Sequence, residues 1–112
     1  LLADVRPGMP AFDEELFGPV ASLIEADSAE EAIRLANATD YGLGASIWTA
    51  DTTLGLALAR RIEAGMVAVN AVPRSDFRLP FGGVKRSGYG RELSRVGLTE
   101  FVNIKTIVVE DV

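Results

Sequence analysis

Residues 45–72, ASIWTADTTLGLALARRIEAGMVAVNAV, hold the clearest structural pattern of the chain. Ala45–Thr49 is predicted to form a strand, and Asp51 follows as the N-cap of a helix that ends near Gly65. Met66–Val72 is apolar at all but one position, which favours a strand covered on both faces over a half-exposed one. The pattern therefore predicts a strand, a helix and a second strand. The apolar face of the helix holds Leu54, Leu58 and Ile62.

The residues before this unit repeat the same order. Val20–Ala26 (VASLIEA) is a short, mostly apolar run and is predicted as a first strand. Ser28 and Glu31 have the spacing of a capping box, in which each side chain accepts a hydrogen bond from the amide of the other residue. A helix begins there, and Asn37–Gly44, with two glycines, ends it. Three strands that alternate with two helices imply right-handed crossovers, so we predict an α/β fold with a βαβαβ parallel three-stranded core.

The segment after the third strand is a long glycine- and proline-rich loop, Pro73–Gly90. It leaves the carboxyl end of a strand, where ligands of parallel sheets gather, so we expect a functional loop. A short helix is predicted over Glu92–Val102. Ile104–Glu110 (IKTIVVE) alternates between two faces and is expected to pair with another sheet edge as an oligomerisation strand. We expect residues 1–112 to form one domain with a single core.

Composition excludes several classes of protein. The chain has no Cys and no His, which removes thiol nucleophiles, disulfides, Cys/His zinc sites and Ser-His-Asp hydrolysis, and no metal site is expected. The net charge of −5 disfavours binding to nucleic acid or to anionic membranes. No apolar run approaches the roughly 20 residues of a membrane helix, so we expect a cytoplasmic protein. Six of the eleven Lys and Arg form a basic segment: Arg74, Arg78, Lys85, Arg86, Arg91 and Arg95.

The sequence contains neither of two common glycine-rich phosphate-binding motifs in complete form. Gly83–Gly88 has the glycine spacing of a P-loop, but Tyr89 and Gly90 stand where Lys and Ser or Thr are needed to contact phosphates and magnesium. No G-x-G-x-x-G occurs, so the usual dinucleotide fingerprint is also missing. Glu14–Val20 (EELFGPV), taken alone, is more typical of a solvated turn than of a site.

Several separate stretches nevertheless follow the order and spacing of one family. From about Gly8 onward, the chain resembles the C-terminal part of the NAD(P)-dependent aldehyde dehydrogenases, and most closely their succinate-semialdehyde branch. One departure is Phe77, where those enzymes usually carry Pro, so the loop backbone could differ there. Leu1 in place of Met favours a chain that begins partway through a longer protein, although processing could give the same end; we expect a partial domain. The stretches are EELFGPV, EEAIRLAN, YGLGASIWTAD, EAGMVAVN, LPFGGVKRSGYGREL and VGLTEFVNIKTIVV.

The resemblance implies roles for four residues. Glu15 is expected to accept hydrogen bonds from the hydroxyls of the nicotinamide ribose of NAD or NADP, an arrangement that charge-assisted bonds favour. Phe17 would pack near the nicotinamide ring. Ser75 would bind the distal carboxylate of a semialdehyde, and Phe81 would supply apolar wall. The basic segment fits an anionic substrate, although a solvated or subunit-facing cluster remains an equal alternative for Lys85, Arg86, Arg91 and Arg95.

The resemblance also implies that catalysis lies outside this chain. Enzymes of this family use a Cys thiolate, hydride transfer to the cofactor and a Glu-activated water, and all three parts precede EELFGPV. We therefore expect no catalytic residue here, and a chain that is inactive on its own. Two hypotheses follow: a C-terminal fragment of an aldehyde-oxidising enzyme, or a non-catalytic α/β association module. Both are expected to form a homo-oligomer through residues 104–110.

Overall fold

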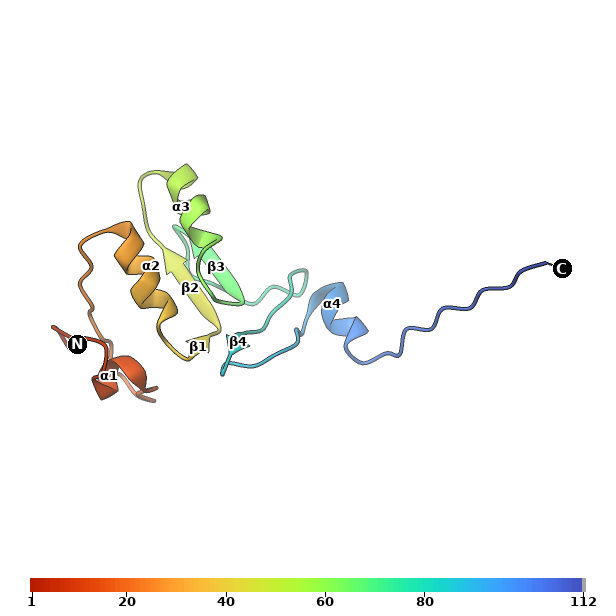
Figure 1. Ribbon diagram of the computed structural model, residues 1–112, viewed down its shortest axis with the longest axis horizontal. Coiled ribbons are helices and arrows are strands. Elements are labelled where there is room, and N and C mark those ends of the chain that lie inside the picture. Colours follow the sequence, from red (N-terminus) through yellow and green to blue (C-terminus); the bar gives the residue numbers. More distant parts are fainter. Residues whose placement is uncertain (112) are drawn as a thin grey trace.

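The structure, a computed structural model, describes residues 1–111. Figure 1 shows a compact body at the N-terminal side and an extended arm at the C-terminal end. The helices are α1 (Pro10–Asp13), α2 (Ala29–Asn37), α3 (Thr52–Ala59) and α4 (Ser94–Thr99). The strands are β1 (Tyr41–Gly42), β2 (Gly44–Ile47), β3 (Met66–Val69) and β4 (Val84–Lys85).

The centre of the body is the predicted strand–helix–strand unit, β2–α3–β3. The two strands are parallel, with Gly44 opposite Met66 and Ile47 opposite Val69. The Asp51 side chain caps α3 by accepting hydrogen bonds from the Thr53 and Leu54 amides, as predicted. The helix ends at Ala59, earlier than expected, and its C-cap is Arg60. The prediction that Gly65 caps this helix is therefore wrong.

The close approach of α3 to the sheet requires glycine at position 55. Gly55 is the buried residue of α3, and a Cβ there would lie 2.8 Å from Thr49 Cγ2 and from Val69 Cγ1. Real Cβ atoms do not approach other atoms so closely, so only glycine permits this spacing. The helix thereby covers one face of the β2–β3 pair, as Figure 1 shows.

The predicted three-stranded parallel core is wrong. Among residues 1–111 the parallel sheet has two strands, and β1 and β4 form a separate antiparallel pair. The predicted first strand, Val20–Ala26, has only an isolated parallel bridge between Ser22 and Leu2. This segment pairs with the N-terminal residues: the Leu2 amide donates to Ala21 O and Leu2 O accepts from the Leu23 amide, each at 2.8 Å.

The predicted capping box of α2 is half confirmed. Ser28 Oγ accepts from the Glu31 amide at 3.1 Å. The Glu31 carboxylate, however, accepts from the amide of Asp27, one residue before the N-cap, at 3.1 Å. Among the described residues, the buried apolar side chains are Ile33 of α2 and Val5.

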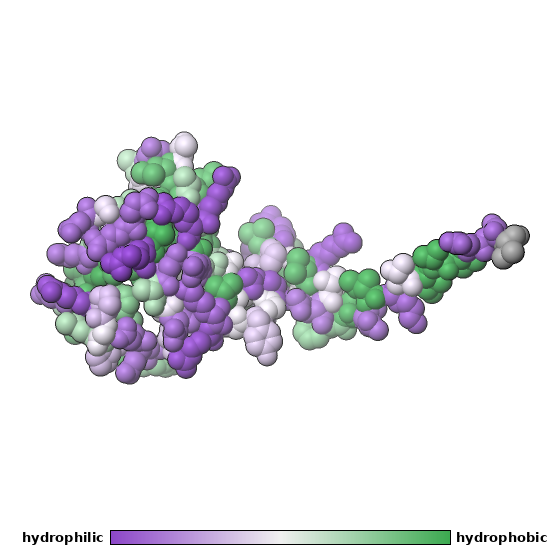
Figure 2. Space-filling view, in the orientation of Figure 1, coloured by the Kyte–Doolittle hydropathy of each residue, from purple (hydrophilic) through white to green (hydrophobic). Residues whose placement is uncertain are grey.

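The C-terminal part differs most from expectation. The last helix spans only Ser94–Thr99, against the predicted 92–102, because its N-cap Leu93 has φ 61° and ψ 171°, outside the helical region. Residues 103–111 have no secondary structure and no strand partner within the described chain. The predicted oligomerisation strand is thus an extended arm. Ile104, Ile107, Val108 and Val109 are at least 76% exposed on it, and Figure 2 shows the apolar side chains along it.

The chain does not bury its own apolar surface. Its radius of gyration is 18.6 Å, whereas a compact domain of this length has about 13 Å. Its accessible surface is 8889 Å², against about 6,000 Å² for a globular protein of this mass. The described residues therefore leave much apolar surface exposed. None of the helices within residues 1–111 is long and apolar enough to span a membrane.

Candidate functional site

The first candidate site is a hollow beside Glu15, which we call the Glu15 hollow. It has a volume of about 370 Å³ and brings the predicted cofactor-binding carboxylate next to the end of the glycine-rich segment. Ser87 also lines this hollow, and its hydroxyl accepts a hydrogen bond from the Gly42 amide at 3.0 Å, which connects the loop to β1. Other lining residues are Thr39, Tyr41, Leu43, Ile62 and Glu63.

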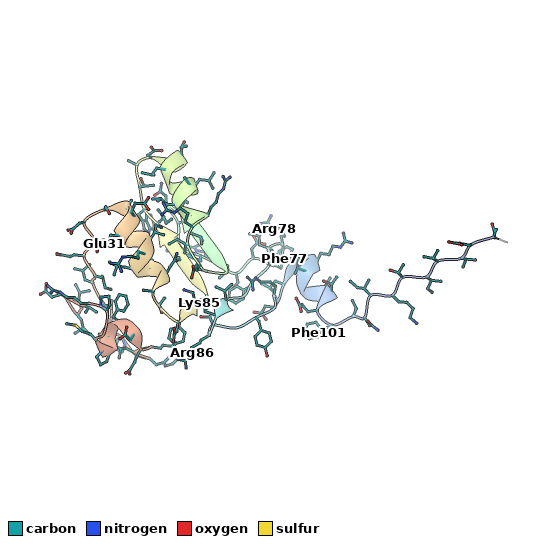
Figure 3. All side chains as sticks on the ribbon, viewed as in Figure 1. Glu31, Phe77, Arg78, Lys85, Arg86 and Phe101 are labelled. Atoms are coloured by element: carbon teal, nitrogen blue, oxygen red, sulfur yellow. The ribbon has the colours of Figure 1, made fainter. Side chains whose placement is uncertain are left out.

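The walls of the Glu15 hollow are joined by Lys85. Its ammonium donates to Asn37 O at 2.7 Å and to Thr39 O at 3.0 Å, and it forms an ion pair with Glu63 at 2.8 Å. Asn37 makes a second connection, since its side-chain amide donates to Arg61 O and accepts from the Glu63 amide. Lys85 thus connects β4 both to the end of α2 and to the turn that follows α3. Figure 3 labels Lys85.

The Glu15 carboxylate is free to accept hydrogen bonds from a ligand. It takes part in none of the side-chain hydrogen bonds or ion pairs among residues 1–111. Ligand sites in proteins have volumes of roughly 300–1,000 Å³, so the hollow suits part of a nucleotide, such as a ribose with its base. The hollow thus offers one unpaired carboxylate, which could accept hydrogen bonds from the hydroxyls of such a ligand. Phe17 does not line this hollow, and its ring is 98% exposed.

The second candidate site, which we call the Phe81 hollow, lies between β3 and the start of the glycine-rich loop. It has a volume of about 290 Å³. Phe81 is held there by paired main-chain hydrogen bonds with Glu92, both at 2.8 Å. Ser75 is exposed and does not line the hollow, although its neighbours Arg74 and Asp76 do. The apolar walls are Met66, Val67, Val72, Leu79 and Pro80.

Glu15 and the start of the glycine-rich loop do not border one common pocket. The structure gives two hollows instead, and no residue lines both. It brings Glu15 together with Ser87 at the loop's end, and Phe81 together with Arg74 and Asp76 at the loop's start. Sequence reasoning missed Ser87 as a wall, because its contact with Gly42 spans 45 positions and no local motif marks it.

A tight turn lies in the glycine-rich loop at residues 76–79. The Asp76 carboxylate accepts from the backbone amide of Arg78 at 2.9 Å, from its Nε at 2.9 Å and from its Nη2 at 2.6 Å. Hydrogen bonding to the Arg78 side chain, then to its amide, lowers the pKa of Asp76 from its ordinary value, and the same pairing raises the pKa of Arg78. The guanidinium also lies 5.8 Å from the centre of the Phe77 ring (Figure 3).

Comparison with known proteins decides the family. Residues 1–107 match the aldehyde dehydrogenase family. The chain belongs to this family. It is 54% identical over 107 residues to a probable NADP-dependent succinate-semialdehyde dehydrogenase of Synechocystis, and 52% identical to the NAD(P)-dependent succinate semialdehyde dehydrogenase of Escherichia coli. Each match covers 96% of this chain, and 24% and 23% of the respective relatives.

Solved structures agree with this aldehyde dehydrogenase assignment. The crystal structure of succinic semialdehyde dehydrogenase from Streptococcus pyogenes with NADP⁺ superposes with a TM-score of 0.92 at 43% identity, covering 97% of this chain and 24% of that one. An aldehyde dehydrogenase of Mycobacterium tuberculosis complexed with NAD⁺ gives a TM-score of 0.84 at 41% identity, over 88% of this chain and 20% of that one. The chain thus spans about a fifth to a quarter of the length of these aldehyde dehydrogenases.

The chain has no residue for thiol-based covalent catalysis. The sequence contains no Cys, so it has no thiolate nucleophile. Within residues 1–111, no group of three or more acidic side chains is arranged to hold a metal ion. What the described residues offer is a free carboxylate, an apolar wall and arginines, which are groups that bind and orient ligands.

Proposed function

We propose that this chain is the C-terminal part of an NAD(P)-dependent aldehyde dehydrogenase that oxidises succinate semialdehyde to the carboxylic acid. The observation that carries the proposal is the unpaired Glu15 carboxylate in a hollow beside the glycine-rich loop, in a chain 54% identical to a probable succinate-semialdehyde dehydrogenase. The relatives are about four times longer than the matched region, which supports a parent enzyme whose nucleophile and base lie elsewhere. The chain alone is then inactive.

Glu15 is proposed to hold the cofactor. Its two oxygens accept hydrogen bonds from the two hydroxyls of the nicotinamide ribose, and charged acceptors make such bonds stronger. The bound cofactor would supply the hydride acceptor for oxidation of the aldehyde. Phe17, whose exposed ring has no cover within the described chain, would pack against the base once the rest of the enzyme is present.

Ser75 and Phe81 are proposed to contact the substrate. Phe81 lines an apolar hollow and so suits the methylene chain of a semialdehyde. Ser75 is exposed and its hydroxyl makes no side-chain hydrogen bond within residues 1–111, so it is available to a carboxylate. Both residues belong to the loop that follows β3.

The test is steady-state kinetics of the complete enzyme with succinate semialdehyde and both NAD⁺ and NADP⁺. Replacing Glu15→Gln should reduce kcat/KM for the preferred cofactor roughly 10- to 100-fold, the loss expected for a charge-assisted hydrogen bond of ~1.5–3 kcal/mol. The matched control is Glu14→Gln, the adjacent carboxylate, which does not line the hollow and should stay within about twofold. Equal effects of the two variants, or no turnover of succinate semialdehyde by the wild type, would refute the proposal.

The exposed arm favours a second candidate, a non-catalytic module that acts by association. Apolar side chains on residues 104–109 need cover, and an extended edge pairs readily with another sheet. In the enzyme the same arm would serve as the subunit contact. The two candidates differ in one assay: the complete protein either converts succinate semialdehyde to succinate with formation of NADPH or NADH, or it associates without turnover.

A further inference from the structure

The side chain of Asn70 continues the pairing of β2 with β3 beyond the last residue of β3. The Asn70 amide donates to Ile47 O at 2.7 Å, at the end of the parallel ladder. Its side-chain carbonyl accepts from the Thr49 amide and its side-chain amide donates to Thr49 O, both at 2.8 Å. One carboxamide thus satisfies both main-chain polar groups of Thr49, as the peptide group of a further strand residue would.

The backbone of Asn70 explains why a side chain takes this place. Its φ is 53°, a left-handed conformation that Asn adopts more readily than most residues other than glycine. The residues after it leave the strand, since the register of β2 with β3 ends at Ile47 and Val69. Glycine would permit the same turn but has no group for Thr49, and Asp at neutral pH would have no donor.

The partner of Asn70 is fixed to α3. Thr49 Oγ1 accepts from the amide of Asp51 at 3.1 Å, and the Asp51 side chain caps the helix. A Cβ at Gly55 would lie 2.8 Å from Thr49 Cγ2, so Thr49 also packs closely against α3. The start of the glycine-rich loop is thus anchored, through Asn70, to the β2–α3–β3 unit.

Asn70 lies in the chain between two parts of the Phe81 hollow. Met66 of β3 belongs to one part, and Val72 and Pro73 at the start of the glycine-rich loop belong to the other. Asn70 itself does not line the hollow. Its effect on the hollow therefore acts through the direction in which the loop leaves β3.

We propose that Asn70 is a positioning residue, whose carboxamide sets the direction of the glycine-rich loop and thereby the shape of the Phe81 hollow that receives the aldehyde. The inference rests on the proposed function, because that function assigns the hollow to the methylene chain of the substrate. A shift of about 1 Å in a positioning element can slow an enzyme about 100-fold. The two hydrogen bonds to Thr49 therefore control substrate preference as well as stability.

The test uses the complete enzyme and two substitutions that remove the pairing by different routes. Asn70→Gly keeps the left-handed backbone and removes both side-chain hydrogen bonds. Asn70→Asp keeps the size of the side chain and one acceptor, but turns a second acceptor oxygen toward Thr49 O.

Both substitutions should change the preference between a long and a short aldehyde. The ratio of kcat/KM for succinate semialdehyde to kcat/KM for acetaldehyde should fall at least about fivefold, because acetaldehyde has no chain long enough to contact the hollow. The change should lie in KM for succinate semialdehyde, while KM for the cofactor stays within about twofold.

The matched control is Asn37→Asp. Asn37 makes the same pair of hydrogen bonds beside the Glu15 hollow, since its side-chain amide donates to Arg61 O at 2.8 Å and its side-chain carbonyl accepts from the Glu63 amide at 2.9 Å. This variant should lower Tm about as much as Asn70→Asp, yet leave the aldehyde ratio within about twofold. The ratio does not depend on how much of the enzyme is folded, so a purely structural role of Asn70 would not change it.

Limited trypsin digestion of the complete enzyme gives a readout that needs no turnover. Arg74 and Arg78 are trypsin sites on the loop that follows Asn70. Cleavage there, followed by mass spectrometry, should be at least about threefold faster in Asn70→Gly than in the wild type or Asn37→Asp, because local opening of an anchored segment limits its proteolysis.

An unchanged aldehyde ratio in either Asn70 variant would overturn the inference, even with faster cleavage, because the loop would then be anchored without shaping the hollow. An equal fall of the ratio in Asn37→Asp would also overturn it, because the effect would not be specific to Asn70. If the wild type does not turn over succinate semialdehyde, the proposed function fails. The trypsin rates then still decide whether Asn70 anchors the loop, and equal rates in the wild type and Asn70→Gly would refute that anchoring.

Discussion

The ammonium of Lys85 donates a hydrogen bond to the carbonyl oxygen of Asn37 over 2.7 Å, and so ties β4 to the end of α2. The lysine side chain is only 24% exposed and also contacts Glu63. Its backbone has φ 55°, a left-handed conformation that is uncommon for residues other than glycine. One side chain therefore fixes three segments that border the Glu15 hollow.

Replacing Lys85→Met should destabilise the complete enzyme by about 1.5–3 kcal/mol, because it leaves carbonyl groups and the Glu63 carboxylate without their charged partner. Thermal unfolding should show a lowered Tm, together with a raised KM for the cofactor. The control is Arg60→Met, an exposed residue at the end of α3 that makes no ion pair within residues 1–111. Equal Tm values for the two variants would contradict the role given to Lys85.

Gly65 should tolerate no side chain. A Cβ at this position would overlap the carbonyl oxygen of Gly82, where the start of β3 meets the glycine-rich loop. Gly65→Ala should therefore displace the loop or cost roughly 1–3 kcal/mol of stability, as overpacking does. Gly18→Ala is the matched control, since a Cβ there meets nothing within 4 Å. Denaturant unfolding should give a lower midpoint concentration for Gly65→Ala than for Gly18→Ala. Similar midpoints for the two variants would count against close packing at Gly65.

The ion pair of Glu30 with Arg61 should give a pH-dependent contribution to stability. The Arg61 side chain lowers the pKa of Glu30 from 4.5 by hydrogen bonding and by its charge. A carboxyl whose pKa is lower in the folded state stabilises the fold above its unfolded pKa and loses that effect as pH falls through the folded pKa.

The Tm difference between wild type and Glu30→Gln should therefore be present at neutral pH and disappear in acid, below the ordinary Glu range. Because the pair is exposed, the difference should be small and should shrink with added salt. A difference that persists at the acidic end of the titration would show that Glu30 acts through packing and not through its charge.

Much of the fold could be predicted from local sequence signals. Asp51 as the cap of an apolar helix is confirmed, and the strand predicted over Met66–Val72 is confirmed for Met66–Val69; both signals depend on near neighbours. Ser28 as the N-cap of α2 is confirmed for the same reason. Neighbouring residues determine caps and periodicity, so a single sequence is enough to find them.

The errors concern the choice of distant partners. Val20–Ala26 has the composition of a strand, but nothing in it indicates that Leu2 would take its hydrogen bonds. Ile104–Glu110 has the alternation of a strand, but no strand within residues 1–111 pairs with it. Glu15 and Ser75 were predicted from the family resemblance, since isolated carboxylates and hydroxyls have no local signature. Likewise, the pairing of Arg78 with Asp76 is a matter of side-chain geometry, which sequence does not reveal.

The contact between Lys85 and Asn37 joins residues 48 positions apart, which has a consequence for the order of folding. Closing a loop of that length costs chain entropy before any stabilising contact forms, whereas α3 forms from neighbouring residues. We expect the β2–α3–β3 unit to assemble first and the ligand-binding walls to become ordered late in folding. Slow or error-prone maturation would then affect binding before it affects the helical content of the protein.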